Sequence, residues 1–403
     1  MDFDIQTLVH VSAYIGGGIA MGFGAIGAAI GEGYTAAQAN CAIADRPDTS
    51  GDLIKTMLVG QAVAESASIF ALVVSILLLF REFPVVGIHK AAALLGAGIS
   101  MGFGAIGSGI GSGLPGGQAC LAIARQPQMA GRLTVTLLIG SAVCQTPAIL
   151  AMIVALMLLF VEFGSAPLTA ASLLGAGICM GLGAIGSGIG SGFPAGEACI
   201  GSARQPEASS LLTTNMLIGS AVCQTPVIFS MVVSLMLMFM KFANAPFNPT
   251  WAALIGAGIS TGLAAIGSGV GGGMAAGGSC EGIARQPESV GGVTTTMLVG
   301  QAVAQTPSIF GLLVSFILMF KTFPEATTLS ASMALLGAGI SMGFGGIGPG
   351  IGNGMAAESA VKWIARNLEM TGDLMRTMLV GQAVSQSTAI YAMVISLVLI
   401  FVV

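Results

Sequence analysis

Residues Gly60 to Ser66 read Gly-Gln-Ala-Val-Ala-Glu-Ser, and variants of this phrase return four more times along the 403-residue chain. The later copies begin at Gly140, Gly219, Gly300 and Gly381, with a period of about 80 residues. Each copy lies inside a long apolar stretch, and a glycine-rich apolar stretch precedes it. Five such periods fill the chain, so a single repeated unit decides the fold.

Both apolar stretches of each period are long enough to cross a bilayer, which takes about 20 residues of helix. The glycine-rich stretches are 15–43, 94–123, 173–200, 254–283 and 335–364, and the second stretches are 53–80, 133–160, 211–239, 293–320 and 374–403. A short polar turn joins the two. The sequence therefore predicts an all-α membrane protein of five tandem transmembrane hairpins, at 1–82, 83–162, 163–242, 243–322 and 323–403.

The composition excludes a soluble enzyme. Hydrophobic residues make up 55% of the chain and charged residues only 7%, whereas soluble domains carry about 25% charge. Most of the surface must therefore contact membrane lipid or other helices. The net charge of −4 argues against a nucleic-acid partner. The seven cysteines lie in or at the ends of apolar stretches without a CxxC motif, which favours a role as small buried side chains.

Glycine recurs at short spacing in the first stretch of every period, as in the run from Gly102 to Gly109. Small residues at such spacing let helix backbones approach closely. A helix with this surface can pack between identical neighbours, as the inner wall of a ring requires. The alternative, packing within a single two-helix bundle, does not explain the fivefold recurrence.

Basic residues are unevenly divided between the two ends of the hairpins. Nine lie near the turns within the hairpins: Arg46, Lys55, Arg125, Arg132, Arg204, Arg285, Lys362, Arg366 and Arg376. Four lie at the other end: Arg81, Lys90, Lys241 and Lys321. The positive-inside rule places the turns in the cytoplasm and both termini outside.

Three motifs together resemble one family. The glycine-rich helix, an Arg-Gln-Pro turn and the phrase at Gly60–Ser66 occur in the same order as in the c subunit of the F-type ATP synthase rotor. The resemblance covers all five hairpins and implies an arc of a rotor ring in a bacterial inner membrane, with glycine helices inside. Ordinary members have one hairpin per chain, so fewer chains should close this ring by contact with copies of themselves.

The resemblance also implies partners at the turns. Central-stalk subunits would contact Arg46, Arg125, Gln126, Pro127, Arg204, Gln205, Pro206, Arg285, Gln286, Pro287 and Arg366. A stator a subunit would supply an arginine that displaces the ion from the ring. The chain itself has no GxxxxGK[ST] nucleotide motif and no expected cofactor, so it would transport an ion without catalysing a reaction.

Only two carboxylates lie well inside the apolar stretches. Glu32 is in the first helix and Glu65 in the second, at similar sequence distances from the turn at 45–49. An antiparallel hairpin brings them to one level. An ionisable group at this depth is costly and indicates a functional site. Glu197, Glu281 and Glu358 lie nearer the cytoplasmic helix ends, where interfacial charge is the favoured interpretation.

Hairpins 2 to 5 have amides where hairpin 1 has Glu65: Gln145, Gln224, Gln305 and Gln386. The positions that match Glu32 are Ser112, Ser191, Gly272 and Asn353. A neutral amide cannot take up a proton or balance the charge of a cation. One ion site per chain is therefore expected. The alternative, that amide dipoles bind ions as carbonyl filters do, would leave a net charge in lipid.

In sodium-carrying relatives, two neighbouring hairpins share the ion site. By that resemblance hairpin 1 supplies the two glutamates, and hairpin 5 supplies a carbonyl, two hydroxyls and a tyrosine. Hairpin 1 has Phe70 at the tyrosine position, and hairpins 2 to 4 have prolines near it, at Pro147, Pro226 and Pro307. The candidate ion-binding residues are Glu65, Glu32, Val63, Ser66, Val384, Ser387, Thr388 and Tyr391. Hairpins 1 and 5 would meet where two chains join head to tail.

Several alternatives remain open from the sequence. The ion is Na⁺ or H⁺: oxygen-rich coordination at Glu65 and Glu32 favours Na⁺, whereas a paired carboxylate also carries H⁺. Other interpretations are a V-type rotor proteolipid or a non-rotary structural ring or channel. One ion per five hairpins gives little electrical work per turn, since one charge crossing 100 mV is worth about 2.3 kcal/mol. Pumping driven by ATP hydrolysis is therefore favoured over synthesis.

Overall fold

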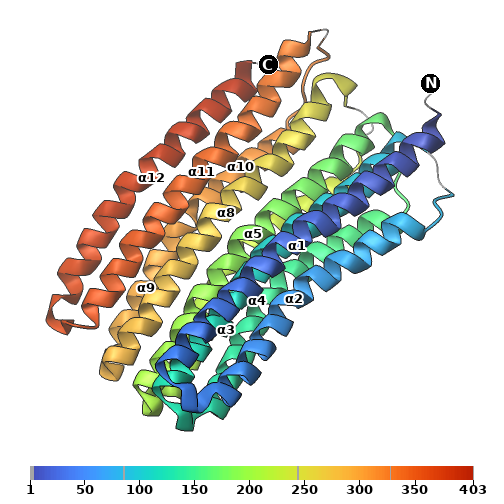
Figure 1. The fold of residues 1–403 in the computed structure, drawn as a ribbon. Coiled ribbons are helices and arrows are strands. Elements are labelled where there is room, and N and C mark those ends of the chain that lie inside the picture. The colour runs from blue at the N-terminus through green and yellow to red at the C-terminus, as the bar shows by residue number, and fades with distance from the viewer. Residues whose placement is uncertain (1–3, 85–86, 243–244, 327, 403) are drawn as a thin grey trace.

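The computed structural model describes residues 4–84, 87–242, 245–326 and 328–402. Within these residues, ten helical spans are long and apolar enough to cross a membrane, and they form five antiparallel hairpins (Figure 1). The prediction of an all-α membrane protein of tandem hairpins is confirmed. The predicted location of both termini outside the cell concerns residues 1–3 and 403, which lie outside the described ranges.

Five long glycine-rich helices form the inner row. They are α1 (Ile5–Asp45), α3 (Ile88–Arg125), α5 (Pro167–Arg204), α8 (Phe247–Arg285) and α11 (Leu329–Ile364). Each packs most extensively on its neighbouring glycine-rich helices in chain order. The approach is close enough to require glycine: a Cβ added at Gly27 would lie 2.5 Å from the Ile106 Cα atom of the neighbouring helix. Backbone cannot yield as a side chain can, so these positions exclude larger residues.

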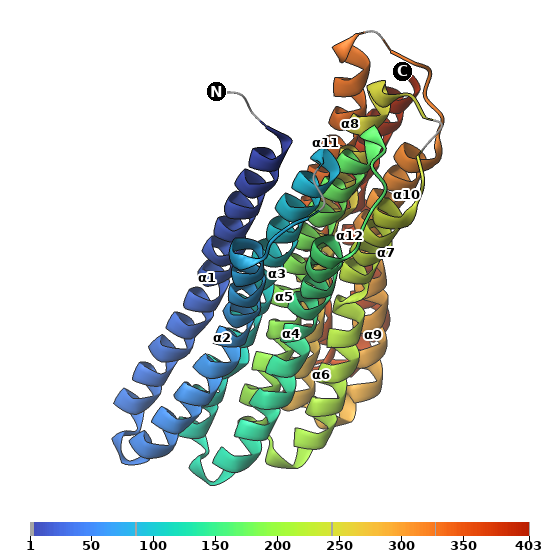
Figure 2. The ribbon, with the colours of Figure 1, turned by 90° about the vertical axis from the view of Figure 1, so that its right-hand side faces the viewer.

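The second helices of the hairpins form the outer row (Figure 2). They are α2 (Ser50–Phe80), α4 (Ala130–Phe160), the pair α6 (Ser209–Cys223) and α7 (Thr225–Phe239), the pair α9 (Val290–Ala304) and α10 (Thr306–Phe320), and α12 (Thr371–Val402). The sequence predicts one continuous helix in each hairpin. The structure interrupts two of them, at Gln224 and Gln305, each two residues before a proline (Pro226 and Pro307), whereas α4 continues through Pro147 at the matching position.

Short 3₁₀ helices form the turns within the hairpins: Pro47–Thr49, Pro127–Met129, Pro206–Ala208, Pro287–Ser289 and Leu368–Met370. In the first four turns the proline is the first residue of the 3₁₀ helix, where its missing N–H costs nothing. All five turns lie at the same end of the molecule (Figure 1).

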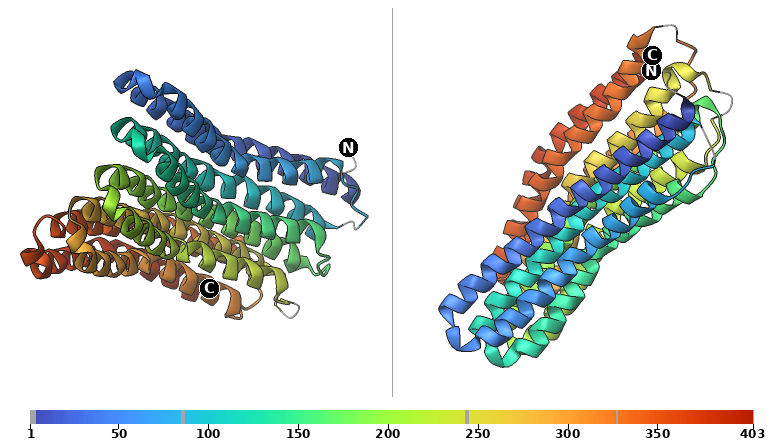
Figure 3. Two further views of the ribbon diagram at one scale, coloured as in Figure 1. Left: turned by 90° about the horizontal axis from the view of Figure 1, so that it is seen from below. Right: turned by 45° about the vertical axis from the view of Figure 1, so that its right-hand side comes forward.

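The array is open, with hairpin 1 and hairpin 5 at opposite ends (Figure 3). Glycines of α1 show that the outer edge of hairpin 1 has no neighbouring helix in the single chain. Gly18 and Gly33 of α1 have no atom of another helix within 4 Å of an added Cβ. At their equivalents on α3, Gly98 and Gly113, an added Cβ would press against the backbone of α1. The two ends of the arc therefore expose the surfaces that are buried at the four internal junctions.

Candidate ion-binding site

The two carboxylates of hairpin 1 lie on facing helices. Glu32 is partly buried on α1 and Glu65 is exposed on α2. Gln61, one helical turn before Glu65, donates from Nε2 to the Glu32 carbonyl oxygen at 3.3 Å, so the two helices are in contact at this level. Every ion pair in the described part of the chain involves other residues.

The same two positions contact each other in other hairpins. Gln145 Nε2 donates to Ser112 Oγ at 2.7 Å in hairpin 2, and Asn353 Nδ2 donates to Gln386 Oε1 at 2.8 Å in hairpin 5. Hairpin 1 thus has two carboxylates where these hairpins have a complementary donor and acceptor. Two carboxylates cannot satisfy each other without a shared proton or a cation.

The amides also follow a regular register between hairpins. Gln145 Nε2 donates to the Val63 carbonyl at 2.9 Å, across the junction from hairpin 2 to hairpin 1. Gln224 reaches the Val143 carbonyl at 2.9 Å in the same way, and Gln305 reaches the Val222 carbonyl at 2.7 Å. Each of these amides is therefore held by the hairpin before it in the chain.

Each of the three prolines leaves one carbonyl of its own helix without a helical N–H, and an amide side chain of the next hairpin donates to that carbonyl. Pro147 lacks the N–H that would bond the Val143 carbonyl four residues earlier, and Gln224 of the next hairpin caps that carbonyl. Pro226 frees the Val222 carbonyl for Gln305 in the same way. Pro307 frees the Val303 carbonyl, which accepts from Asn353 Nδ2 at 3.3 Å. The prolines and the amides thus form a matched set that fills the internal sites with neutral hydrogen bonds.

A second row of amides seals two junctions one turn nearer the hairpin turns. Gln301 Nε2 donates to the carbonyls of Gly219 and Gly272, both at 2.9 Å. Gln382 Nε2 donates to the carbonyls of Gly300 at 3.1 Å and Asn353 at 2.9 Å. Both side chains are buried. Gln61 is the matching residue of hairpin 1, and no hairpin precedes it in the chain.

The hairpin 5 candidates lie on α12, at the far edge of the arc from Glu65. Tyr391 is 66% exposed and Val384 is 69% exposed. Ser387 Oγ donates to the Val384 carbonyl at 2.7 Å, and Thr388 Oγ1 donates to the Ser385 carbonyl at 3.0 Å. A single chain therefore does not bring the hairpin 5 candidates to Glu32 and Glu65. Val63 and Ser66 of hairpin 1 lie instead at the junction with hairpin 2, where Ser66 Oγ donates to the Val63 carbonyl at 2.6 Å.

The turn residues form an exposed basic rim. Arg46, Arg125, Arg204, Arg285 and Arg366 are all exposed, and the Gln-Pro pairs beside three of them are partly buried. The Arg366 guanidinium lies 4.3 Å from the centre of the Trp363 ring. This rim is the surface on which the resemblance places the stalk contacts.

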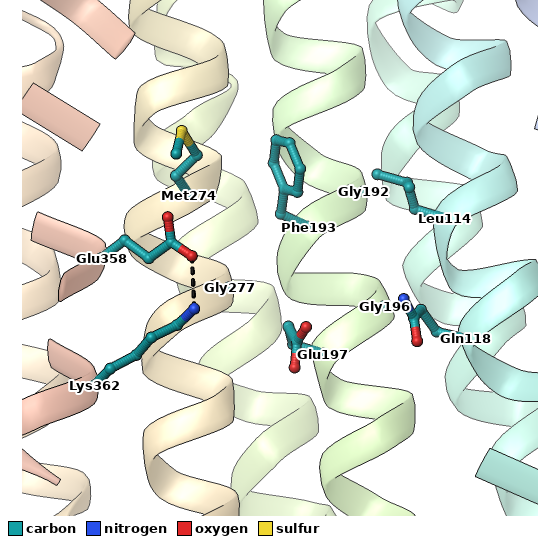
Figure 4. A pocket seen from close by; sticks show the side chains of 10 residues that line it. All are labelled: Leu114, Gln118, Gly192, Phe193, Gly196, Glu197, Met274, Gly277, Glu358 and Lys362. Carbon is teal, nitrogen blue, oxygen red and sulfur yellow. Dashed lines mark hydrogen bonds and ion pairs between the residues drawn. The ribbon is translucent and has the colours of Figure 1, made fainter. Parts of the chain in front are cut away.

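A charged network joins α8 and α11 near the turns, and sequence reasoning did not find it. Lys362 Nζ lies 2.9 Å from Glu281 and 2.7 Å from Glu358, and Arg285 lies 2.7 Å from Glu281. Glu358 and Lys362 also line a cavity of about 160 Å³ together with Glu197 and Gln118 (Figure 4). The i, i+4 spacing of Glu281 with Arg285 and of Glu358 with Lys362 was the available signal.

A profile of the ATP synthase c-subunit family matches five segments of the chain, at residues 15–78, 95–158, 174–237, 255–318 and 336–399. The ATP synthase c subunit of Natranaerobius thermophilus is 48% identical over 84 residues, which are 21% of this chain and 95% of the relative. The ATP synthase c subunit of Alkaliphilus oremlandii is 47% identical over 73 residues, 18% of this chain and 82% of the relative. One of the ATP synthase c subunits of Pelobacter propionicus, numbered 2, is 49% identical over 70 residues, 17% of this chain and 77% of the relative.

Proposed function

This chain belongs to the ATP synthase c-subunit family, as a rotor-ring subunit with five family repeats in one polypeptide, and on that premise we propose that it carries one ion site per chain. The site forms where hairpin 5 of one copy meets hairpin 1 of the next. The interior hairpins carry no exchangeable ion.

The register of the internal junctions supports this location. Gln145, Gln224 and Gln305 each donate to the valine carbonyl two residues before the matching position of the preceding hairpin. One further step in this register places Glu65 beside the Val384 carbonyl of an adjoining copy. The same step pairs Gln61 with Gly381, as Gln382 pairs with Gly300.

The residues that meet in this way suit a hard cation. Glu65 and Glu32 provide carboxylate oxygens, Val384 a carbonyl, and Ser387 and Thr388 hydroxyls, while the Tyr391 hydroxyl donates to Glu65. Val63 and Ser66 complete the wall toward hairpin 2. Oxygen-only ligand sets favour hard cations. Na⁺ is therefore the proposed ion, with H⁺ as the competing one.

The internal amides support a single ion per chain. Gln145, Gln224 and Gln305 each donate to a carbonyl of the preceding hairpin at 2.7–2.9 Å, and Gln145, Gln305 and Gln386 are buried. A cation placed there would meet no negative charge. With few ions per turn, ion flow supplies little free energy for each ATP made. We therefore propose that the complex hydrolyses ATP to pump ions.

The family also supplies the proposed surroundings. The basic rim contacts central-stalk subunits, the carboxylate face passes a stator a subunit, and the remaining outer surface contacts membrane lipid. The excess of lysine and arginine at the turns supports a cytoplasmic rim and outer termini in a bacterial inner membrane.

The test measures protection of Glu65 from a carbodiimide in the purified ring. At constant pH, Na⁺ should slow labelling of Glu65, whereas K⁺ at equal ionic strength should not. Peptide mapping should find the Na⁺-protected label in hairpin 1 alone, at Glu65 or Glu32. Labelling that depends on pH and ignores Na⁺ would make H⁺ the transported ion, and ions bound in the interior hairpins would refute the single-site proposal.

A further inference from the structure

One position of the inner row differs in hairpin 1 alone. At the place of Ala29, the other four inner helices have Gly109, Gly188, Gly269 and Gly350. In each of those helices, an added Cβ would press on the backbone of the preceding inner helix. For Gly109 it would lie 2.5 Å from Ala28 N, and for Gly269 it would lie 2.5 Å from Ser187 N. Such contacts leave no room for a methyl group.

Ala29 has that methyl group at the free edge of α1. The register of the internal junctions places it against Gly348 and Pro349 of the adjoining copy. An added Cβ at Gly348 meets no atom within 4 Å, so this edge is uncovered in the single chain. Ordinary van der Waals contact begins at 3.4 Å, so a methyl group at the internal spacing would be about 1 Å too close. The junction between chains must therefore be wider here than the junctions within a chain.

The widening falls at the ion site. Ala29 precedes Glu32 by three residues, which puts both on one face of α1. The residues that match Glu32 in hairpins 2, 3 and 5, namely Ser112, Ser191 and Asn353, are fully buried under closely packed junctions. Glu32 has more atoms than any of them and is the residue whose surroundings Ala29 enlarges.

The amount of space distinguishes the two ions. A protonated carboxyl group donates to a carbonyl oxygen at an oxygen–oxygen distance of about 2.5–3.0 Å. The internal junctions already allow such a distance, as the hydrogen bonds of Gln145 and Gln305 show. Ca²⁺, a cation of nearly the radius of Na⁺, binds oxygens at about 2.3–2.6 Å, so oxygens on opposite sides of it are about 5 Å apart. A metal cation needs a wider junction and a proton does not.

We propose that Ala29 is a positioning residue that spaces the junction between chains, so that the site of Glu32 and Glu65 accepts a metal cation. This inference rests on the proposed location of the site. Ala29 does not touch the ion. It acts through the separation of α1 from α11 of the adjoining copy.

The first test is structural and uses the assembled wild-type ring. The separation between the Cα atoms of Ala29 and the adjoining copy's Gly348 is compared with that between Gly109 and Gly27 in the same ring. We expect the first separation to be greater by about 1 Å. Equal separations would overturn the proposal.

The second test uses three variants and the Na⁺ concentration that half-protects Glu65 from a carbodiimide. Ala29→Gly should raise that concentration at least about tenfold, as loss of a residue that orients metal ligands commonly does. Ala29→Ser keeps the Cβ and should stay within about threefold of wild type, as should Ala142→Gly, which makes the same change on the exposed face of α4.

A pH profile of labelling without Na⁺ separates spacing from general damage. Ala29→Gly should keep the wild-type profile, because a proton does not need the added width. Unchanged Na⁺ protection in Ala29→Gly would overturn the role of Ala29 and leave the proposed function intact. Absence of Na⁺ protection in wild type would instead refute the metal-ion function itself.

Discussion

At the scale of single residues, the difference between a carboxylate and an amide separates hairpin 1 from the other four. Gln145 and Gln386 each form a neutral hydrogen bond with the residue opposite, whereas hairpin 1 has Glu65 and Glu32 at the two matching positions. An amide is neutral and has its own donor and acceptor, so it can bond to fixed protein groups without an ion, as Gln145 Nε2 and Gln386 Oε1 do. An ionised carboxylate in an apolar setting needs a cation or a proton.

Glu65→Gln should therefore abolish coupled ion transport and leave the ring assembled. The new amide would find the same acceptors as the amides of the other hairpins. ATP-driven Na⁺ uptake into vesicles should fall to background, while the ring keeps its mass in a native gel. Glu82→Gln, which removes an exposed carboxylate between hairpins, is the matched control and should transport normally. Retained transport in Glu65→Gln would favour a structural ring or channel.

The prolines and amides should be coupled in energy. Pro226→Ala restores an N–H that competes with Gln305 for the Val222 carbonyl. It should therefore stabilise the protein by less than the roughly 3 kcal/mol that a helix-interior proline costs. In a double-mutant cycle with Gln305→Leu, the coupling should be about 0.5–1.5 kcal/mol. The same cycle with Gln145→Leu, whose acceptor is Val63, should give a value near zero; equal couplings would contradict the pairing. Unfolding in mixed micelles provides the measurement.

At the scale of helices, the inner row depends on backbone contact at glycine. A Cβ added at Gly109 would lie 2.5 Å from the Ala28 backbone nitrogen of α1. Gly109→Ala should therefore lower the unfolding free energy by about 1–3 kcal/mol, although alanine favours helix. Gly131→Ala, at a helical position with no atom within 4 Å, should instead raise stability slightly. A stabilising Gly109→Ala would show that the inner helices are packed loosely.

Much of this level could be predicted from the sequence, because the five repeated motifs and the apolar lengths are local signals. The order of the inner helices also follows from short connectors and repeated glycine. The helix interruptions at Gln224 and Gln305 were not predicted. The prolines were visible, yet the same position gives two outcomes, because α4 continues through Pro147 while the helices that contain Pro226 and Pro307 are interrupted. The network of Glu281 and Lys362 was missed because it joins two hairpins that are distant in the sequence.

At the scale of the whole molecule, the free edges of hairpins 1 and 5 should join in head-to-tail copies. Gly60 on α2 packs against Gly116 on α3, and Gly300 packs against the Ala357 side chain in the same register. One further step pairs Gly381 with Ala36 of an adjoining copy. Gly381→Cys with Ala36→Cys, in a chain whose exposed Cys41 is serine, should form a disulfide between chains.

Non-reducing gels should show that disulfide as covalent multimers that end at the full ring. Ala62→Cys with Gly381→Cys, where Ala62 is on the exposed side of α2, should give little cross-linking. A folded double-cysteine chain that stays monomeric would contradict head-to-tail closure.

The covalent links between hairpins have a consequence for how such a rotor can vary. A ring of separate hairpins can gain or lose one unit at a time, and its ratio of ions to ATP changes in small steps. A closed ring of this chain contains hairpins only in multiples of five. With the single site per chain proposed above, the loaded positions would recur at equal angles, separated by four hairpins without an ion to exchange. The number of ions per turn could then change only by addition or removal of a whole polypeptide, or by a substitution that places a carboxylate in another hairpin.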